Sequence, residues 1–239
     1  MYTPTWDKYD REARVFPALL TLLPFFILEY FFLREHFTQW TSIIRVLEST
    51  LVSTASVSLS VVLLFFVMSL IQLISKSGFQ KFYFKNSLYL PTTSFLLYSN
   101  KEFSLPRKKK IREKIKADFG AKLASEKEEG EDELEARKII DEAVGYIRNA
   151  VKGGRFVLVH NIHYGFWRNL IGGSTIGILL SVVDIVVFYY YDHQPVLLLF
   201  SWFLGTCYLI ILLLSKIIMN SLAVSYAKRL YEEYLSGTY

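Results

Sequence analysis

Residues 170–218 read LIGGSTIGILLSVVDIVVFYYY, then DHQP, then VLLLFSWFLGTCYLIILLLSKII. Each long run holds about 20 mostly apolar residues, the length that an α-helix needs to cross the hydrocarbon core of a bilayer. The sequence therefore predicts two membrane helices, Leu170–Tyr191 and Val196–Ile218, joined by a short loop.

Two further apolar runs lie earlier in the chain, at Val15–Leu33 and Leu51–Ile74. Hydrophobic residues make up 52% of the 239 residues and aromatic residues 16%, which suits a large lipid-facing and interfacial surface. We expect an α-helical integral membrane protein with four transmembrane helices and a small cytoplasmic α or α+β domain.

The distribution of Lys and Arg predicts which loops face the cytoplasm. Residues 75–169 carry 19 of them, residues 34–50 carry two and residues 192–195 carry none. Cytoplasmic loops are enriched in these residues, so both termini are expected inside. The expected segments are a cytoplasmic N-terminal stretch at 1–14, membrane helices one and two at 15–74, a cytoplasmic domain at 75–169, membrane helices three and four at 170–218, and a cytoplasmic C-terminal helix at 219–239.

The cytoplasmic segment changes in character along its length. Gly78–Leu105 is rich in aromatic and β-branched residues, and Arg155–His160 is a short apolar run, so both favour short strands. Arg107–Leu123 and Glu133–Val151 carry apolar residues at helical spacing and predict helices. The stretch Ser125–Asp132 between them predicts a charged turn.

The first membrane helix contains two prolines, Pro17 and Pro24. Proline has no backbone N–H and tends to kink a helix. We expect neighbouring helices to bond the carbonyls that these prolines leave free.

Two acids lie inside the predicted membrane helices. Glu29 and Asp184 each lie 14 residues from the inner end of their helix, or about 21 Å at 1.5 Å per residue. A ring of acids at one level is typical of a cation pathway. The alternative is that Glu29 reaches the outer interface near Arg34 and Asp184 bonds a neighbouring Tyr. Further pore candidates are the small polar residues Ser53, Ser56 and Ser60 on one face of helix two, which alternatively allow close helix packing.

A second candidate site is the set of cations in the cytoplasmic domain. Cations interleaved with aromatic residues can bind phosphates and stack bases. The alternative is attraction to anionic lipid headgroups. His163 and its neighbour His160 lack other ligands at metal spacing, so no metal site is expected. The ligand candidates are Lys81, Lys85, Lys108, Lys109, Lys110, Arg112, Arg148, Arg155, His163 and Arg168.

Four phrases spread over most of residues 8–173 carry a family resemblance: KYDREARVFPALL (8–20), LPTTSFLL (90–97), IREKIKADFG (111–120) and NIHYGFWRNLIGG (161–173). They resemble a family of bacterial four-helix membrane proteins and are similar to the HalA channel subunits of the Hailong anti-phage system. The resemblance implies a bacterial inner-membrane location and a nucleotide or oligonucleotide ligand made by a partner nucleotidyltransferase.

The chain carries no nucleophile, P-loop or metalloprotease motif, so we expect neither an enzyme nor a bound cofactor. Four helices enclose little space, and a water pathway therefore predicts a homo-oligomer, a tetramer or a similar ring. The leading hypothesis is an ion-conducting pore gated by an anionic nucleotide at the cytoplasmic domain. The alternative is a non-conducting scaffold that recruits a protein partner through that domain.

Overall fold

The structure is a computed structural model whose described residues are helical wherever they are regular. It divides into two compact units. The apolar unit comprises Met1–Ser75 and Phe166–Ser215, and the polar unit comprises Lys76–Gly165 and Lys216–Tyr239. The described residues are 8–31, 51–85, 87–151, 155–192 and 195–237, with the side chains of 51–60, 155–156 and 191–192 left outside the description.

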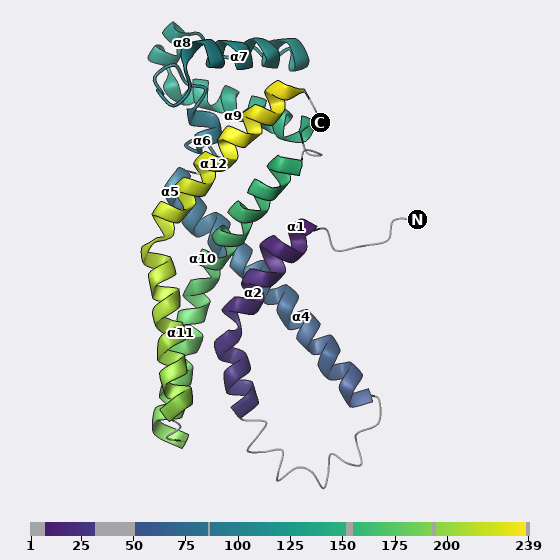
Figure 1. Cartoon of the computed structure of the whole chain (residues 1–239), viewed down its shortest axis with the longest axis vertical. Helices are drawn as coiled ribbons and strands as arrows, with labels where there is room; N and C mark the ends of the chain where they lie inside the picture. Colours follow the sequence, from purple (N-terminus) through teal and green to yellow (C-terminus); the bar gives the residue numbers. More distant parts are fainter. Residues whose placement is uncertain (1–7, 32–50, 86, 152–154, 193–194, 238–239) are drawn as a thin grey trace. The chain divides into compact units, whose positions relative to one another are not determined.

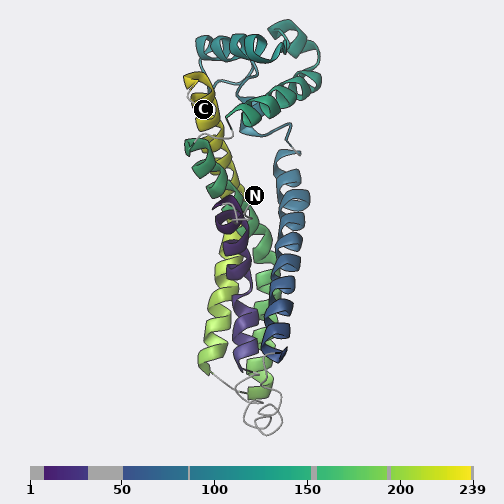
Figure 2. The same ribbon diagram turned by 90° about the vertical axis from the view of Figure 1, so that its right-hand side faces the viewer.

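Long apolar helices build the apolar unit (Figure 1). Three helices among the described residues are long and apolar enough to cross a membrane, and a bent helix pair at the N-terminal end makes a fourth candidate. In chain order the elements are α1 (Lys8–Asp10), η1 (Arg11–Val15), α2 (Phe16–Thr21), the helix Leu23–Phe31, α4 (Leu51–Leu73), α10 (Arg155–Val187), η3 (Phe188–Asp192) and α11 (Pro195–Leu213). Helices α10 and α11 pack against each other, with Gly205 of α11 opposite Ser181 of α10, and Figure 2 shows the same helices turned by 90°.

Pro17 changes the hydrogen bonding of the first helix. The turn before it widens into the π-helix η1, where Phe16 N–H donates to Arg11 O, five residues back. Pro17 cannot donate to Ala13 O, and Asn169 Nδ2 of α10 donates to that oxygen at 2.5 Å. Asn169 is fully buried, so α10 supplies the hydrogen-bond donor that the proline lacks.

Pro24, seven residues after Pro17, also leaves a carbonyl of its helix without a backbone donor. The helix breaks at Leu22, and the two halves meet at 45°. Pro24 leaves Leu20 O without its helical donor, and the hydroxyl of Tyr208 in α11 donates to it at 2.5 Å. The prediction that neighbouring helices bond both freed carbonyls is confirmed.

Small residues on α10 allow the other helices to approach closely. A Cβ atom at Gly172 would lie 3.0 Å from Ile71 O of α4, and one at Gly177 would lie 2.8 Å from the ring of Tyr208. Both distances are too short for a side chain without movement of the neighbour. Gly172 therefore permits α10 to pack against the backbone of α4, and Gly177 makes room for the Tyr208 ring of α11.

The polar unit is built from short and medium helices around one apolar core. Its elements are η2 (Ile74–Gln80), α5 (Lys81–Phe84), α6 (Pro91–Ser94), α7 (Leu105–Phe119), α8 (Glu126–Glu131), α9 (Glu133–Ala150), the start of α10 and α12 (Ser215–Ser236). The predicted helices at Arg107–Leu123 and Glu133–Val151 correspond to α7 and α9. Gly120 ends α7 in the left-handed conformation, with φ of 67°, which glycine adopts without steric cost.

The C-terminal helix α12 belongs to the core of the polar unit. Its residues Ala227, Leu230, Tyr231 and Tyr234 are fully buried, in one cluster with Ile111 of α7 and with α9. The sequence separates residues 219–239 from the domain at 75–169, whereas the structure packs them together.

The strands predicted for the polar unit are wrong. Residues 155–160 begin the 33-residue helix α10, and the part of 78–105 that is described forms η2, α5, α6 and turns. The described residues contain no strand, so the domain is α rather than α+β. Ser125–Asp132 is also more than a turn, because Ser125 and Glu128 form a capping box that starts α8.

Candidate functional site

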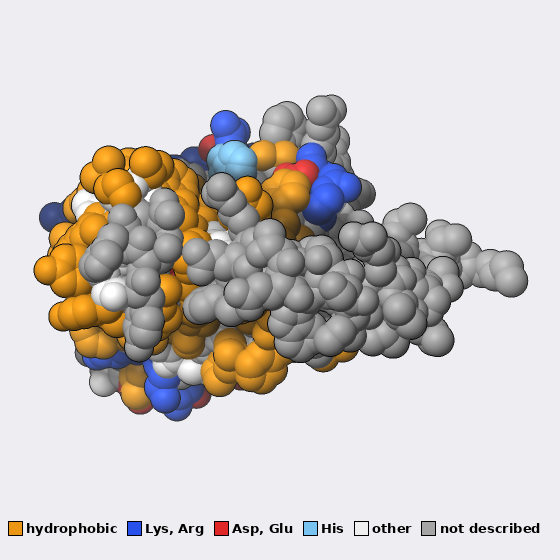
Figure 3. Space-filling model, turned by 90° about the horizontal axis from the view of Figure 1, so that it is seen from below, with side chains coloured by type: hydrophobic (Ala, Val, Ile, Leu, Met, Phe, Trp, Pro, Cys, Tyr) orange, Lys and Arg blue, Asp and Glu red, His pale blue; other side chains and the backbone are white. Residues whose placement is uncertain are grey.

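A seam of small and polar residues runs through the interior of the apolar unit, where α10 meets α11. Ser181 of α10 and Ser201 of α11 are fully buried, and Gly205 lies opposite Ser181. Both serine hydroxyls donate to carbonyls of their own helix, at 2.8 Å and 2.9 Å. Around the seam the unit is apolar, and hydrophobic side chains cover most of the coloured surface in the end view of Figure 3.

Asp184 lies on the same face of α10, three residues after Ser181. The residue is 1% exposed, and neither of its carboxylate oxygens has a hydrogen-bond partner among the described residues. A buried ionised carboxylate costs several kcal/mol unless it is paired. Asp184 is therefore an isolated acid in an apolar interior, about one helical turn from Ser181.

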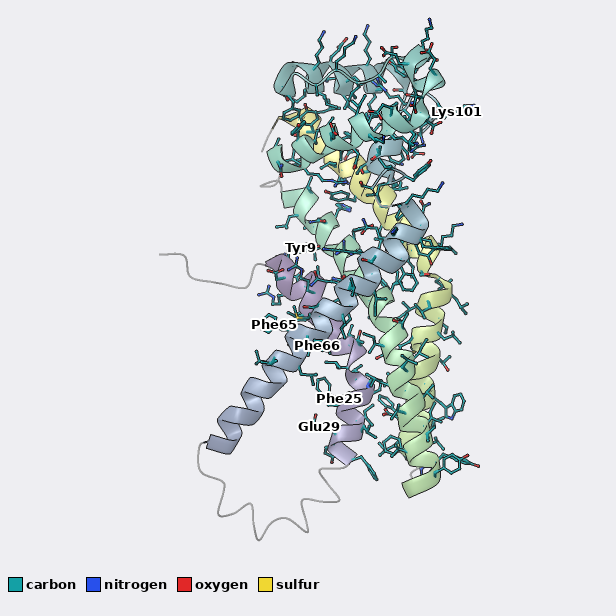
Figure 4. The ribbon with its side chains drawn as sticks, turned by 180° about the vertical axis from the view of Figure 1, so that it is seen from behind. Tyr9, Phe25, Glu29, Phe65, Phe66 and Lys101 are labelled. Atoms are coloured by element: carbon teal, nitrogen blue, oxygen red, sulfur yellow. The ribbon has the colours of Figure 1, made fainter. Side chains whose placement is uncertain are left out.

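Glu29 lies at a similar depth but on a different side. Phe31 contacts Phe188 with ring centroids 5.2 Å apart, which fixes a common level for the two helices. Measured along each helix axis at 1.5 Å per residue, Glu29 lies about 3 Å from Phe31 and Asp184 about 6 Å from Phe188. Glu29 is exposed on the helix Leu23–Phe31 (Figure 4), whereas Asp184 is buried. Within one chain, Glu29 and Asp184 therefore lie at similar heights along their helices but do not contact each other.

The other pore candidates, Ser53, Ser56 and Ser60, lie in α4. Their side chains fall outside the described part of the structure, and their role stays a prediction.

Two of the predicted ligand cations lie inside the polar unit. Lys108 is 1% exposed, and its amino group donates to the carbonyls of Leu97, Tyr98 and Asn100. Arg112 donates to the carbonyls of Leu96 and Ala124. Burial lowers the pKa of the Lys108 amino group, and the nearby Glu129 carboxylate opposes that shift. Both cations hold the backbone of the 96–100 turn rather than face solvent.

Glu129 completes this arrangement, although it is not among the site residues predicted from the sequence. The residue is 5% exposed, and its carboxylate accepts the backbone N–H groups of Tyr98 and Ser99 at 2.9 Å and 3.0 Å. It also lies 3.6 Å from the guanidinium of Arg112. The turn is therefore held by cations at its carbonyls and by an acid at its amides. A sequence signal for α8 existed, because Ser125 and Glu128 have capping-box spacing.

The LPTTS segment is held in a similar way. Arg148 donates to Thr92 Oγ1 at 3.2 Å, and the hydroxyl of Tyr231 donates to Thr92 O. Arg137 of α9 donates to Ser94 Oγ at 3.1 Å. Arg148, a predicted ligand residue, thus contributes to joining α6 with α9.

The remaining predicted cations occupy different places. Lys109 and Lys110 are exposed on α7, with Lys109 4.0 Å from Glu113. Arg168 is buried, and the side chain of Arg155 is outside the described residues. The other exposed members are Lys81, Lys85 and His163. The predicted set is therefore divided between the interior and several separate surfaces.

Within the described ranges, no group of three or more His, Cys, Asp or Glu residues is placed to hold a metal ion. No family model, curated protein or solved structure matches this chain.

Proposed function

We propose that the chain forms a homo-oligomeric, cation-conducting pore in the bacterial cell membrane, and that an anionic nucleotide or oligonucleotide bound at the polar unit gates it as an anti-phage effector. The observation that carries the proposal is Asp184, a buried and unpaired acid in a helix long and apolar enough to span a bilayer. Ionisable residues inside membrane helices are costly and characteristically serve ion or proton pathways.

The surroundings of Asp184 suit a cation. The hydroxyls of Ser181 and Ser201 donate to their own helices, which leaves their oxygen lone pairs able to accept or coordinate. A carboxylate with nearby hydroxyl oxygens presents the hard oxygen ligands that small cations prefer. The exposed Glu29 supplies a second acid at a similar depth, on a surface that another copy can reach.

The chain connections offer a route for gating. The chain passes between the two units at 75–76, 165–166 and 215–216. One of these passages is α10, an unbroken helix that begins in the polar unit at Arg155 and carries Asp184 in the apolar unit. Binding energy at the polar unit can therefore act on the helix that holds the acid.

The resemblance supports a nucleotide as the ligand, and the exposed amines of Lys109 and Lys110 are the α7 cations available to it. Lys108 and Arg112 are left out of the proposed ligand surface because they hold the 96–100 turn. The ligand is expected to bind more weakly as salt increases, since phosphate contacts release counterions.

Reversal-potential measurements in planar bilayers test the proposal. The wild-type protein is expected to conduct cations in preference to anions, and Asp184→Asn to lower conductance or selectivity while assembly persists. Glu142→Gln, an exposed acid on α9, serves as the matched control and should behave as wild type. Adding nucleotide on the side of the polar unit should change the open probability.

Other results would reject the pore. If Asp184→Asn keeps full selectivity and Asp184→Leu prevents assembly, the acid serves helix packing only. A wild-type protein that stays silent with and without oligonucleotides would favour the non-conducting scaffold.

A further inference from the structure

An aromatic and basic hollow lies on η2 and α5, immediately after α4. It has a volume of about 510 Å³ and is open to solvent. Its lining, mostly apolar, comes from Ser77, Gly78, Phe79, Lys81, Phe82 and Tyr83. We call this feature the aromatic–basic hollow.

The aromatic side of the hollow exposes an unusual amount of apolar surface. Phe82 is 82% exposed, and its ring lies 5.4 Å from that of Tyr83, which in turn lies 6.1 Å from the ring of Phe79. A Cβ atom at Gly78 would meet nothing within 4 Å. Among the described residues this ring faces solvent, so it is available for contact with an apolar ligand.

Lys81 is the charged residue that lines the hollow, and Lys76 and Lys85 are close to it in the chain. Lys76, Lys81 and Lys85 have exposed side chains, and the sequence contains no Asp or Glu between Glu48 and Glu102. Lys85 adopts the left-handed conformation, with φ of 43°, a position that favours glycine or asparagine. Its amino group lies 4.7 Å from the centroid of the Tyr89 ring, at the C-terminal end of α5.

We propose that the aromatic–basic hollow binds one anionic phospholipid, with the lysines on its phosphate headgroup and the aromatic rings against the start of its acyl chain. The residues Val61–Phe84 form one candidate span, so the hollow occupies the end of that span. Aromatic side chains prefer this headgroup level, and lysines there extend towards the lipid phosphates. The proposal rests on the membrane placement in the proposed function.

A lipid fits the hollow better than a nucleotide does. The lining side chains offer only Ser77, Lys81 and Tyr83 as polar groups, which is too few to bond the edge of a base as well as a phosphate. The open apolar floor instead suits a flexible acyl chain. The bound lipid would then fix the chain where α4 leaves the bilayer.

Native mass spectrometry of the full-length protein in detergent tests this assignment. The protein is extracted from membranes and given an equimolar mixture of phosphatidylglycerol and phosphatidylcholine. Wild type is expected to retain one phosphatidylglycerol in preference. Lys81→Gln with Lys85→Gly should lower that retention about fivefold per lysine, and Phe82→Ser should weaken both lipids. The α7 control, Lys116→Gln of α7 together with Lys101→Gln, removes two exposed amines outside the hollow and should retain lipid as wild type does.

The Lys85→Gly change relieves the left-handed backbone, so the loss of lipid cannot arise from a strained fold. Equal retention of the two lipids by wild type, or an equal loss in the α7 control, would overturn the proposal. Displacement of phosphatidylglycerol by millimolar inorganic phosphate or oligonucleotide would assign the hollow to free phosphates instead. If the protein retains phosphatidylglycerol selectively but does not conduct, the lipid site stands and the pore proposal is rejected. If the protein is missing from the membrane fraction, the lipid site and the pore are both rejected.

Discussion

The hydrogen bond from Tyr208 to Leu20 O exists because Pro24 cannot donate to that carbonyl, and this dependence is open to a direct test. Tyr208→Phe removes only the hydroxyl, which lies 2.5 Å from Leu20 O. Tyr208 is 4% exposed, so water does not readily replace it. Hydrogen bonds between membrane helices contribute about 0.6 kcal/mol on average and up to about 1.7 kcal/mol, and the Leu22 N–H offers Leu20 O only a poorly aligned alternative. We expect Tyr208→Phe to lower the free energy of unfolding by about 1–2 kcal/mol.

Pro24→Ala should rescue this variant. Alanine in place of Pro24 restores the backbone N–H that a helix directs to Leu20 O, four residues back. Once that N–H is present, the hydroxyl of Tyr208 becomes dispensable, so the double variant should lose much less stability than the sum of its parts. The expected coupling between the two changes is about 1 kcal/mol, as for groups that share one acceptor.

Unfolding of the four proteins by SDS in mixed micelles, followed by circular dichroism, measures the cycle. Tyr189→Phe alters a tyrosine that is 57% exposed and serves as the control, with an expected change of less than about 0.5 kcal/mol. If Tyr208→Phe is no less stable than this control, or if Pro24→Ala gives no rescue, the proline explanation fails.

Three further predictions concern other contacts. Lys108→Met should lower the unfolding free energy by about 3 kcal/mol because three carbonyls lose their donor. The control Lys109→Met changes an exposed residue and should alter this free energy by less than about 0.5 kcal/mol. Equal melting temperatures for the two variants would contradict the prediction. Gly172→Ala places a methyl group 3.0 Å from a backbone oxygen of α4 and should cost about 1–3 kcal/mol, visible as a lower midpoint in SDS. Hydrogen bonds from Ser125 lower the pKa of Glu128 below 4.5, so this acid stabilises the fold above that pH and less as the pH falls through its lowered pKa. Glu128→Gln should therefore be less stable than wild type at pH 7 and indistinguishable at low pH, and a gap independent of pH would argue against the capping box.

Several features of the fold follow from the sequence because local chemistry specifies them. The apolar runs are long enough for spans, and the spacing of Ile111 and Ile115 predicts a buried face on α7, where both are fully buried. The positions of the prolines predict which backbone carbonyls lose their helical donors. The need for other hydrogen-bond donors, here Asn169 and Tyr208, was therefore predictable. The donors themselves were not, because they lie 156 and 188 residues away in the chain.

The candidate site was predictable only in part. Asp184 stands out in the sequence as an acid in an apolar run, but its burial on the seam with α11 depends on packing. The set of cations looked uniform in sequence, yet Lys108 and Arg112 are directed inward to the 96–100 turn while Lys109 faces solvent. Neighbouring positions on a helix point in different directions, and only the placement of the turn decides which of them is buried.

The sequence by itself determined the helical spans, the two proline sites and the helices α7 and α9, since each depends on residues close together in the chain. The tertiary structure decided that residues 155–160 continue as helix, that α12 enters the core of the polar unit, and that Glu129 binds the amides of the 96–100 turn. A short apolar run suits a strand or a buried helix equally. Here residues 155–160 form the first turns of α10, and Val157 packs into the core that the helices α7 and α9 share with the C-terminal helix α12.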